Sequence, residues 1–186
     1  MDEWLAVVLP GRGYGPLGAT IRFPCLLLES LGARIAVIDY PVAVSEPVAL
    51  EEVARASRVQ LESILNAVSP QRVTFISKSL GGAVLSSLNS DACRAARVEA
   101  IWLTPLFNDA LVRSGAIKLG WRSLLVAGTA DPYHDPDGFN VVRSALSGES
   151  LIVPGANHSL EVPKDPKATL SALHDLIAAV RSFLTS

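Results

Sequence analysis

The sequence predicts an α/β protein with an open, mostly parallel six-stranded sheet and helices on both faces. Short apolar runs alternate along the chain with longer segments in which apolar residues recur every three or four positions. The short runs lack the polar–apolar alternation of a half-exposed strand, as is typical of parallel strands covered on both faces. Strands that alternate with amphipathic helices favour an open parallel sheet over a sandwich or a helical bundle.

Six short apolar runs are the expected strands. They span residues 4–9, 34–38, 73–76, 100–103, 123–127 and 151–153. The chain of 186 residues suits a single domain, 1–186. A domain of this size buries roughly 70% of the surface that its unfolded chain would expose, which is enough for a full core.

The segments between these runs are expected to supply the helices. The segment 50–68 has apolar residues at helical spacing, and Asp165-Pro166 is a cap with a first-turn proline that opens the last helix. Another helix is expected around residues 25–31, starting near Pro24, and one more begins near Leu80. The segment 104–120 has no strand pattern and is expected to be a loop with one helix at most.

Composition and charge argue against several classes of protein. The chain is 49% hydrophobic and 18% charged, which is not a disordered composition, and its net charge of −2 gives no electrostatic case for nucleic acid or anionic membranes. There is no secretion signal pattern, no apolar run of the ~18 residues that a membrane helix needs, and no metal-ligand spacing. We therefore expect a cytoplasmic protein that uses no metal, and the sequence leaves its oligomeric state open.

A glycine pattern in the loop after the first strand suggests a dinucleotide site. Residues 13–18 read G-x-G-x-x-G, and Asp39 follows about twenty residues later. A Rossmann-like dinucleotide-binding domain is therefore one alternative. Such a site needs a helix that begins at this turn, whereas Pro16 and Pro24 place the expected helix start near Pro24. The loop would then be too long to hold a pyrophosphate on the end of the helix.

The segment 73–82, VTFISKSLGG, is the most informative in the chain. It runs from a strand into Ser79, which has the small residues Ser77 and Gly81 two positions before and after it, and then into a helix. Small residues at these positions allow a tight turn beside the neighbouring strand and helix. We interpret Ser79 as a nucleophile with the Leu80 amide beside a developing oxyanion. The alternative is that Ser79 only caps the helix.

A serine nucleophile needs a base, and the base needs a third group to orient it. Asp131 follows the run 123–127, although an Asp-Pro pair also favours a turn by itself. Asp135 and Asp137 are the fallback acids, but their proline-rich surroundings favour a loop.

Three histidines compete for the role of base. His158 follows the last strand, whereas His134 lies close to the acid loop and His174 lies in the terminal helix. Because the carboxyl ends of parallel strands meet at one edge of a sheet, we expect Ser79, Asp131 and His158 to gather there.

The order Ser79, Asp131, His158 on this scaffold resembles the α/β-hydrolase superfamily, and in particular its small lidless members. These include dienelactone-hydrolase-like proteins and small carboxylesterases. The turn at Ser79 is similar to the nucleophile elbow G-x-S-x-G, with Ser77 in place of the first glycine. The loop Pro10-Gly11-Arg12-Gly13 and the turn Asp39-Tyr40-Pro41 match the family's loops after its first two core strands.

The resemblance implies a minimal α/β-hydrolase fold with no cap domain, because the segment 104–120 is too short for one. It implies a serine hydrolase that cleaves a carboxylic ester or thioester of a small acyl substrate through a triad and an acyl-enzyme, with no cofactor. The oxyanion donors would be the amides of Leu80 and Arg12, with Gly13 as second choice, because Pro10 replaces the usual loop histidine. The expected pocket residues are Arg12, Tyr14, Lys78, Pro105, Leu106, Phe107 and Tyr133.

A second alternative is a non-catalytic binding protein on the same fold, since a fold does not fix a function. The unusual Pro10 and Ser77 are the features that favour it. An acyltransferase with the same triad is a third alternative that the sequence does not separate from a hydrolase.

Overall fold

The computed structural model describes residues 3–40, 50–88, 93 and 97–186, and the six expected strands are all present. Pro41, the last residue of the turn Asp39-Tyr40-Pro41, lies outside the described residues. In chain order, the elements are β1 (Trp4–Leu9), α1 (Ala19–Ser30), β2 (Arg34–Val37), α2 (Leu50–Val68), β3 (Arg72–Lys78), α3 (Leu80–Ser86), β4 (Arg97–Leu103), α4 (Ala110–Leu119), β5 (Arg122–Gly128), α5 (Pro136–Ala145), β6 (Glu149–Val153) and α6 (Pro166–Thr185).

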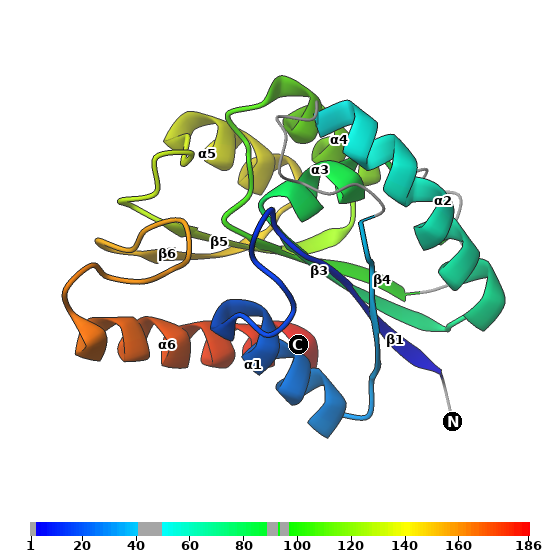
Figure 1. The fold of residues 1–186 in the computed structure, drawn as a ribbon, viewed down its shortest axis with the longest axis horizontal. Helices are drawn as coiled ribbons and strands as arrows, with labels where there is room; N and C mark the ends of the chain where they lie inside the picture. The colour runs from blue at the N-terminus through cyan, green and yellow to red at the C-terminus, as the bar shows by residue number, and fades with distance from the viewer. Residues whose placement is uncertain (1–2, 41–49, 89–92, 94–96) are drawn as a thin grey trace.

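The strands form one sheet in the order β2-β1-β3-β4-β5-β6, and every neighbouring pair is parallel. The prediction of an open parallel sheet is therefore confirmed. Helices α1 and α6 lie below the sheet in Figure 1, and α2, α3, α4 and α5 lie above it. Because all strands run the same way, the loops that follow them open at one common edge.

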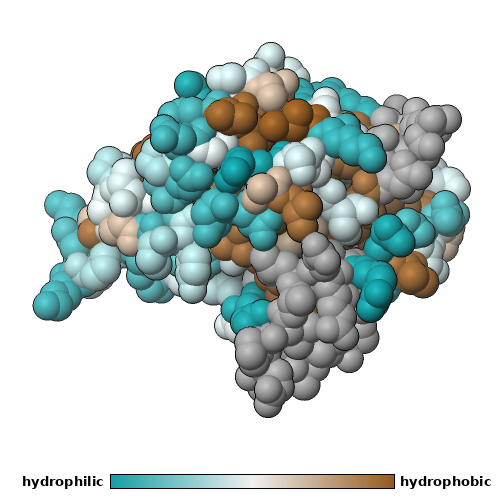
Figure 2. Space-filling model, turned by 90° about the horizontal axis from the view of Figure 1, so that it is seen from above, coloured by the Kyte–Doolittle hydropathy of each residue, from teal (hydrophilic) through white to brown (hydrophobic). Residues whose placement is uncertain are grey.

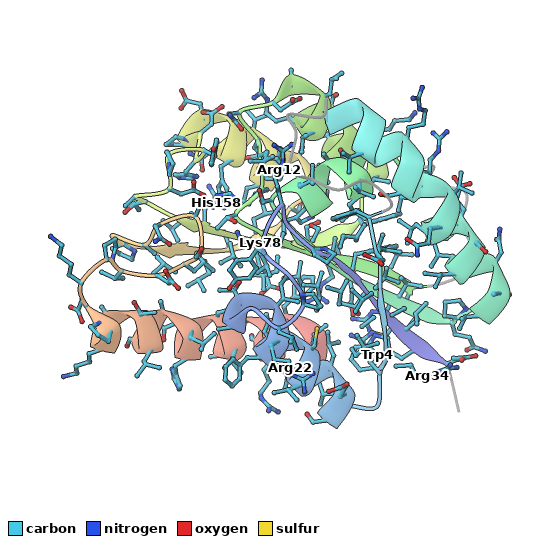
Figure 3. All side chains as sticks on the ribbon, viewed as in Figure 1. Trp4, Arg12, Arg22, Arg34, Lys78 and His158 are labelled. Carbon is cyan, nitrogen blue, oxygen red and sulfur yellow. The ribbon has the colours of Figure 1, made fainter. Side chains whose placement is uncertain are left out.

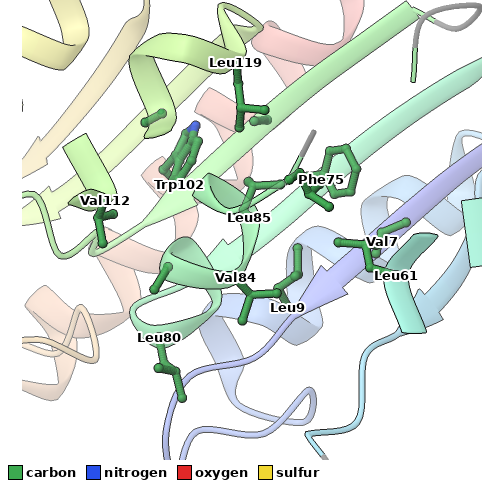
Figure 4. Packing of buried hydrophobic residues seen from close by; sticks show 14 of the residues in the cluster. Val7, Leu9, Leu61, Phe75, Leu80, Val84, Leu85, Trp102, Val112 and Leu119 are labelled. Carbon is green, nitrogen blue, oxygen red and sulfur yellow. The ribbon is translucent and has the colours of Figure 1, made fainter. Parts of the chain in front are cut away.

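Alternate residues of each strand enter two separate cores. In β1, Leu5, Val7 and Leu9 face the helices above, whereas Ala6 and Val8 face α1 and α6. This double burial explains the continuous apolar runs in the sequence. Figure 4 shows the upper core, where side chains of β1, β3 and β4 pack against α2, α3 and α4.

Helix α1 starts earlier than the sequence predicted. It begins at Ala19, directly after Gly18, and Pro24 lies inside it, so the expected start near Pro24 is wrong. Pro24 is buried on the same face as Ile21, Cys25 and Leu28. Burial of this face keeps the helix continuous although proline removes one of its hydrogen bonds.

The two connections that follow β4 and β5 each hold one helix. The segment 104–120 contains only α4, so no cap domain is present there. Helix α5 was missed, because Asp135 and Asp137 were expected in a loop. Asp135 is its N-cap, accepting a hydrogen bond from the amide of Asp137, and Pro136 is its first residue. The same Asp-Pro signal correctly predicted α6, so it was present in the sequence for α5 as well.

A buried carboxylate anchors the amino-terminal end of the sheet. Glu99 is fully buried and forms ion pairs with Arg72 at 2.6 Å and with Arg122 at 3.5 Å. Arg72 also donates to the carbonyl of Leu184 at 2.9 Å, which ties α6 to β3. This cluster lies at the opposite end of the strands from the loops that carry the candidate site.

Seen from the side of α2 to α5, the surface is a mixture of hydrophilic residues and smaller hydrophobic areas (Figure 2). Among the described residues, the helices of this face expose single apolar side chains such as Val59, Leu111 and Val141. Isolated exposed apolar residues of this kind are usual on a protein surface. In the described part of the chain, no helix is both long and apolar enough to cross a membrane.

Candidate active site

Ser79 lies between the end of β3 and the start of α3 in a backbone conformation that residues other than glycine rarely adopt. Its φ is 51° and its ψ is −109°. Its amide donates to the carbonyl of Leu103 at 3.1 Å, but its side chain makes no capping hydrogen bond to α3. Ser79 is therefore not a capping serine in the ordinary sense, because its hydroxyl points elsewhere.

The residues two positions before and after Ser79 explain why this turn needs small side chains. Ser77 is buried and donates to the carbonyl of Ile101 at 3.4 Å. A Cβ placed on Gly81 would lie 2.0 Å from the carbonyl oxygen of Leu9. The start of α3 thus sits directly against β1, and only glycine at position 81 permits that approach.

His158 links Ser79 to Asp131 through two short hydrogen bonds. Its Nε2 lies 2.8 Å from Ser79 Oγ, and its Nδ1 lies 2.7 Å from Asp131 Oδ2. Because a carboxylate only accepts, Nδ1 carries the proton and Nε2 is left to accept from the serine hydroxyl. The three side chains come from the loops after β3, β5 and β6, as the parallel topology predicts.

The carboxylate of Asp131 is held in its charged form. Its second oxygen accepts from the Tyr133 amide at 2.9 Å, and its side chain is 1% exposed. Burial alone would raise the pKa of Asp131, but the hydrogen bonds from His158 and Tyr133 and the nearby charge of Lys78 lower it. The Tyr133 ring also packs against the His158 imidazole with the ring centres 5.0 Å apart.

The competing acid and bases lie elsewhere. Asp135 caps α5 and pairs with Arg113 at 3.5 Å. His134 packs edge-on against Phe139, and the His174 side chain is 82% exposed on α6. The geometry therefore selects Asp131 and His158 as the partners of Ser79.

The loop after β1 brings Arg12 beside Ser79. The amide of Gly11 donates to the carbonyl of Tyr14 at 3.2 Å and the amide of Tyr14 donates back at 3.3 Å, with Gly13 in the left-handed region at φ 64°. Tyr40 donates from its hydroxyl to the carbonyl of Pro10 at 2.7 Å in a partly buried hydrogen bond, which fixes the start of this turn. The Leu80 amide, at the first position of α3, has no partner within its own helix.

A cleft of about 300 Å³ opens over Ser79. It is lined by Arg12, Ser79, Leu80, Leu106, Tyr133 and His158. Of the expected pocket residues, Arg12, Leu106 and Tyr133 line this cleft. Pro105 is not part of its wall.

Three other expected pocket residues do not reach this wall. Phe107 is 1% exposed and packs in the core against Trp102. Tyr14 turns toward α1, where its hydroxyl accepts from the amide and the hydroxyl of Thr20. Lys78 is 1% exposed and lies below the sheet edge, because alternate residues of β3 face opposite sides of the sheet.

The Lys78 side chain ends in a polar enclosure under the site. Its Nζ donates to Thr104 Oγ1 and to the carbonyl of His158, both at 2.5 Å. Burial lowers the pKa of Lys78 to about 8, and the charge of Asp131 partly opposes that shift. In Figure 3, Lys78, His158 and Arg12 lie close together, far from Trp4 and Arg34 near the other end of the sheet. Sequence reasoning missed Thr104, whose positive φ of 43° has no sequence signal.

The sequence argument against a dinucleotide site was a late start of the first helix, but the structure gives a different argument. Helix α1 does begin directly after Gly18. However, a Cβ at Gly18 would lie 2.2 Å from the Tyr14 ring, so this glycine accommodates an aromatic side chain. The Tyr14 hydroxyl also accepts from the Thr20 amide in the first turn of α1. That end of the helix is thus covered by the loop's own side chain.

Comparisons with known proteins identify the fold. An α/β serine hydrolase homologue from Coxiella burnetii matches 98% of this chain and 85% of its own, with a TM-score of 0.71 and 14% identity. A Xanthomonas campestris α/β serine hydrolase without a lid matches 98% of this chain and 81% of its own, with a TM-score of 0.67 and 15% identity. Esterase 2 of Thermogutta terrifontis, phosphorylated by paraoxon, matches 99% of this chain and 82% of its own, with a TM-score of 0.70 and 14% identity.

No protein-family model matches the sequence, and no curated protein does. The structural matches nevertheless show that the chain has the α/β-hydrolase fold. The part between β4 and β5 carries no cap domain. Among the described residues, no group of three or more His, Cys, Asp or Glu side chains is placed to hold a metal ion.

Two adjacent glycines test the packing of the turn. We expect Gly81→Ala to lower the free energy of unfolding by about 3 kcal/mol, because its methyl group would collide with the backbone of β1. Gly82→Ala would meet only the Trp102 ring at 3.6 Å and should raise the free energy of unfolding by about 0.5–1 kcal/mol. Urea denaturation measures both, and equal effects of the two substitutions would contradict this account of the turn.

Proposed function

We propose that this protein is a serine hydrolase that cleaves a carboxylic ester or thioester through Ser79, His158 and Asp131. The observation that carries the proposal is the pair of hydrogen bonds, 2.8 Å and 2.7 Å long, that joins the three side chains. The strained backbone of Ser79 supports it, because such strain persists where the surrounding structure enforces it and is concentrated at functional sites.

The first half of the reaction forms an acyl-enzyme. Ser79 Oγ attacks the carbonyl carbon of the substrate while His158 Nε2 takes the hydroxyl proton. Asp131 keeps the imidazole oriented and stabilises its charged form. The oxyanion of the tetrahedral intermediate accepts hydrogen bonds from the amides of Leu80 and Arg12. The partial positive charge at the N-terminus of α3 also stabilises this negative charge.

The second half returns the enzyme to its starting state. His158 gives its proton to the leaving alcohol or thiol, and water then attacks the acyl-enzyme with His158 as the base. The His158 side chain is 26% exposed, so water reaches it without a conformational change. An acceptor other than water would make the same site an acyltransferase, which product analysis would distinguish.

The cleft favours a small acyl group. Its volume of about 300 Å³ is at the lower end of ligand sites, and Leu80, Leu106 and Tyr133 give it apolar walls. The structural neighbours named above are a serine hydrolase homologue, a serine hydrolase without a lid and an esterase, which supports hydrolase chemistry on this fold. A small-molecule acyl substrate and a cytoplasmic location remain predictions.

Labelling with a fluorophosphonate probe tests the nucleophile. We expect wild-type protein to be labelled and Ser79→Ala to remain unlabelled, because the probe reacts with an activated serine. Circular dichroism of the variant checks that it is folded. Absence of labelling in folded wild-type protein would overturn the proposed hydrolase and favour a binding protein, and stabilisation by NAD or FAD in a thermal shift assay would favour the dinucleotide alternative.

Two asparagine substitutions test the acid. Asp131→Asn should lower kcat for p-nitrophenyl esters by about four orders of magnitude, because the amide no longer holds the required tautomer of His158. Asp135→Asn is the matched control in the same loop. It should leave kcat unchanged and at most weaken the cap of α5 by about 1 kcal/mol. A larger loss of kcat in the control would assign the acid to Asp135.

A further inference from the structure

The ammonium of Lys78 lies where three of the loops around the site meet. It donates to Thr104 at the end of β4 and to the carbonyl of His158 after β6, each at 2.5 Å. The Tyr14 ring, from the loop after β1, lies 5.1 Å from Nζ. The aliphatic stem passes Gly11, where an added Cβ would lie 3.2 Å from Lys78 Cγ. One side chain therefore contacts both the histidine loop and the loop that carries Arg12.

Lys78 occupies an unusual position for a charged side chain. Lys78 is 1% exposed, and a buried ammonium destabilises a fold unless its partners compensate for lost hydration. Thr104 Oγ1 also donates to the His158 carbonyl at 3.1 Å, so the two loops would remain linked by that hydrogen bond without the lysine. An apolar side chain of similar length would fill the same space without the cost of burying an ammonium. The charge is therefore best explained by the site above it.

We propose that Lys78 is a positioning residue of the active site: its ammonium holds the backbone of His158 in place and balances the buried charge of Asp131. The proposal rests on the proposed function of Ser79, His158 and Asp131. Lys78 does not touch the cleft, so it acts through His158 and Asp131 and not on the substrate. Small errors in the placement of a catalytic base can lower a rate by about 100-fold.

With this role for Lys78, the reaction rate and the contribution of Lys78 to folding stability should change in opposite directions at alkaline pH. The titratable residues near Lys78 are Asp131, Tyr14 and His158, which come from three different loops, and His158 contacts the ammonium through its backbone carbonyl. As the pH rises above about 8, the folded protein loses the ammonium, whereas an unfolded lysine keeps its proton up to about 10.5. The unfolded chain binds more protons in this window, so this group makes folding more favourable as the pH rises. Over the same window the hydrogen bond to His158 loses its charge, and the rate should fall.

The substitution Lys78→Met tests the proposal, because methionine keeps an unbranched stem and removes the charge. Asp131 keeps its hydrogen bonds from Tyr133 and His158 in this variant, so we expect a thermal unfolding midpoint at pH 7 that changes little, with kcat and the rate of fluorophosphonate labelling lowered about 100-fold. The fall of kcat above pH 8 should also disappear. Arg72→Met, at the other end of the same strand, is the control: it should lower the unfolding midpoint and leave kcat unchanged.

A variant with wild-type kcat and the same fall at alkaline pH would overturn the role of Lys78. If Lys78→Met does not fold, Thr104→Val replaces it. This variant keeps the lysine and removes both the Thr104 contact to the ammonium and the Thr104 hydrogen bond to the His158 carbonyl, so the pH profile is the readout. A shift in the alkaline fall of kcat would support the proposal, and an unchanged pH profile would overturn it. Absence of labelling in wild-type protein would overturn the proposed function together with this inference. If wild-type protein is labelled and Lys78→Met has the same labelling rate and kcat, only the inference about Lys78 is overturned.

Discussion

The turn between β3 and α3 constrains the whole site. Helix α3 begins directly against the carbonyl of Leu9, and Gly81 is the residue at that contact. With the helix so close to β1, the chain has room for only one residue between strand and helix, and Ser79 takes a positive φ to make the connection. A conformation of this kind destabilises a fold by about 1–3 kcal/mol. Burial of α3 from Leu80 to Leu85 offsets it.

The two ends of the sheet use buried charge in different ways. At the amino end, Glu99 is surrounded by arginines whose side chains are partly exposed, and these contacts hold α6 on the sheet. At the carboxyl end, Lys78 and Asp131 lie below and beside His158 with little exposure. The first arrangement joins secondary structure elements. The second surrounds the imidazole that we propose as the catalytic base, and preorganised charge has its largest effect at such a position.

Most glycines of the loop after β1 have a role in tertiary packing. Gly18 accommodates the Tyr14 ring, Gly11 accommodates the stem of Lys78, and Gly13 supplies the left-handed residue of a tight turn. Packing or backbone conformation thus accounts for Gly11, Gly13 and Gly18, whereas a Cβ on Gly15 would meet nothing within 4 Å. The same pattern at the end of a strand can thus arise from a phosphate site or from close packing, and the neighbouring side chains distinguish the two.

The fold class, the strands and the three loops that carry Ser79, Asp131 and His158 could be predicted from the sequence alone. This was possible because apolar periodicity and small-residue turns are local, and because parallel strands bring successive loops to one edge. Only the three-dimensional contacts show that His158 pairs with Asp131 and not with Asp135, that Lys78 and Phe107 are buried, and that α1 starts at Ala19. Those features depend on which side chains meet across the sheet and on the burial of whole helix faces, which outweighs local preferences such as that of Pro24.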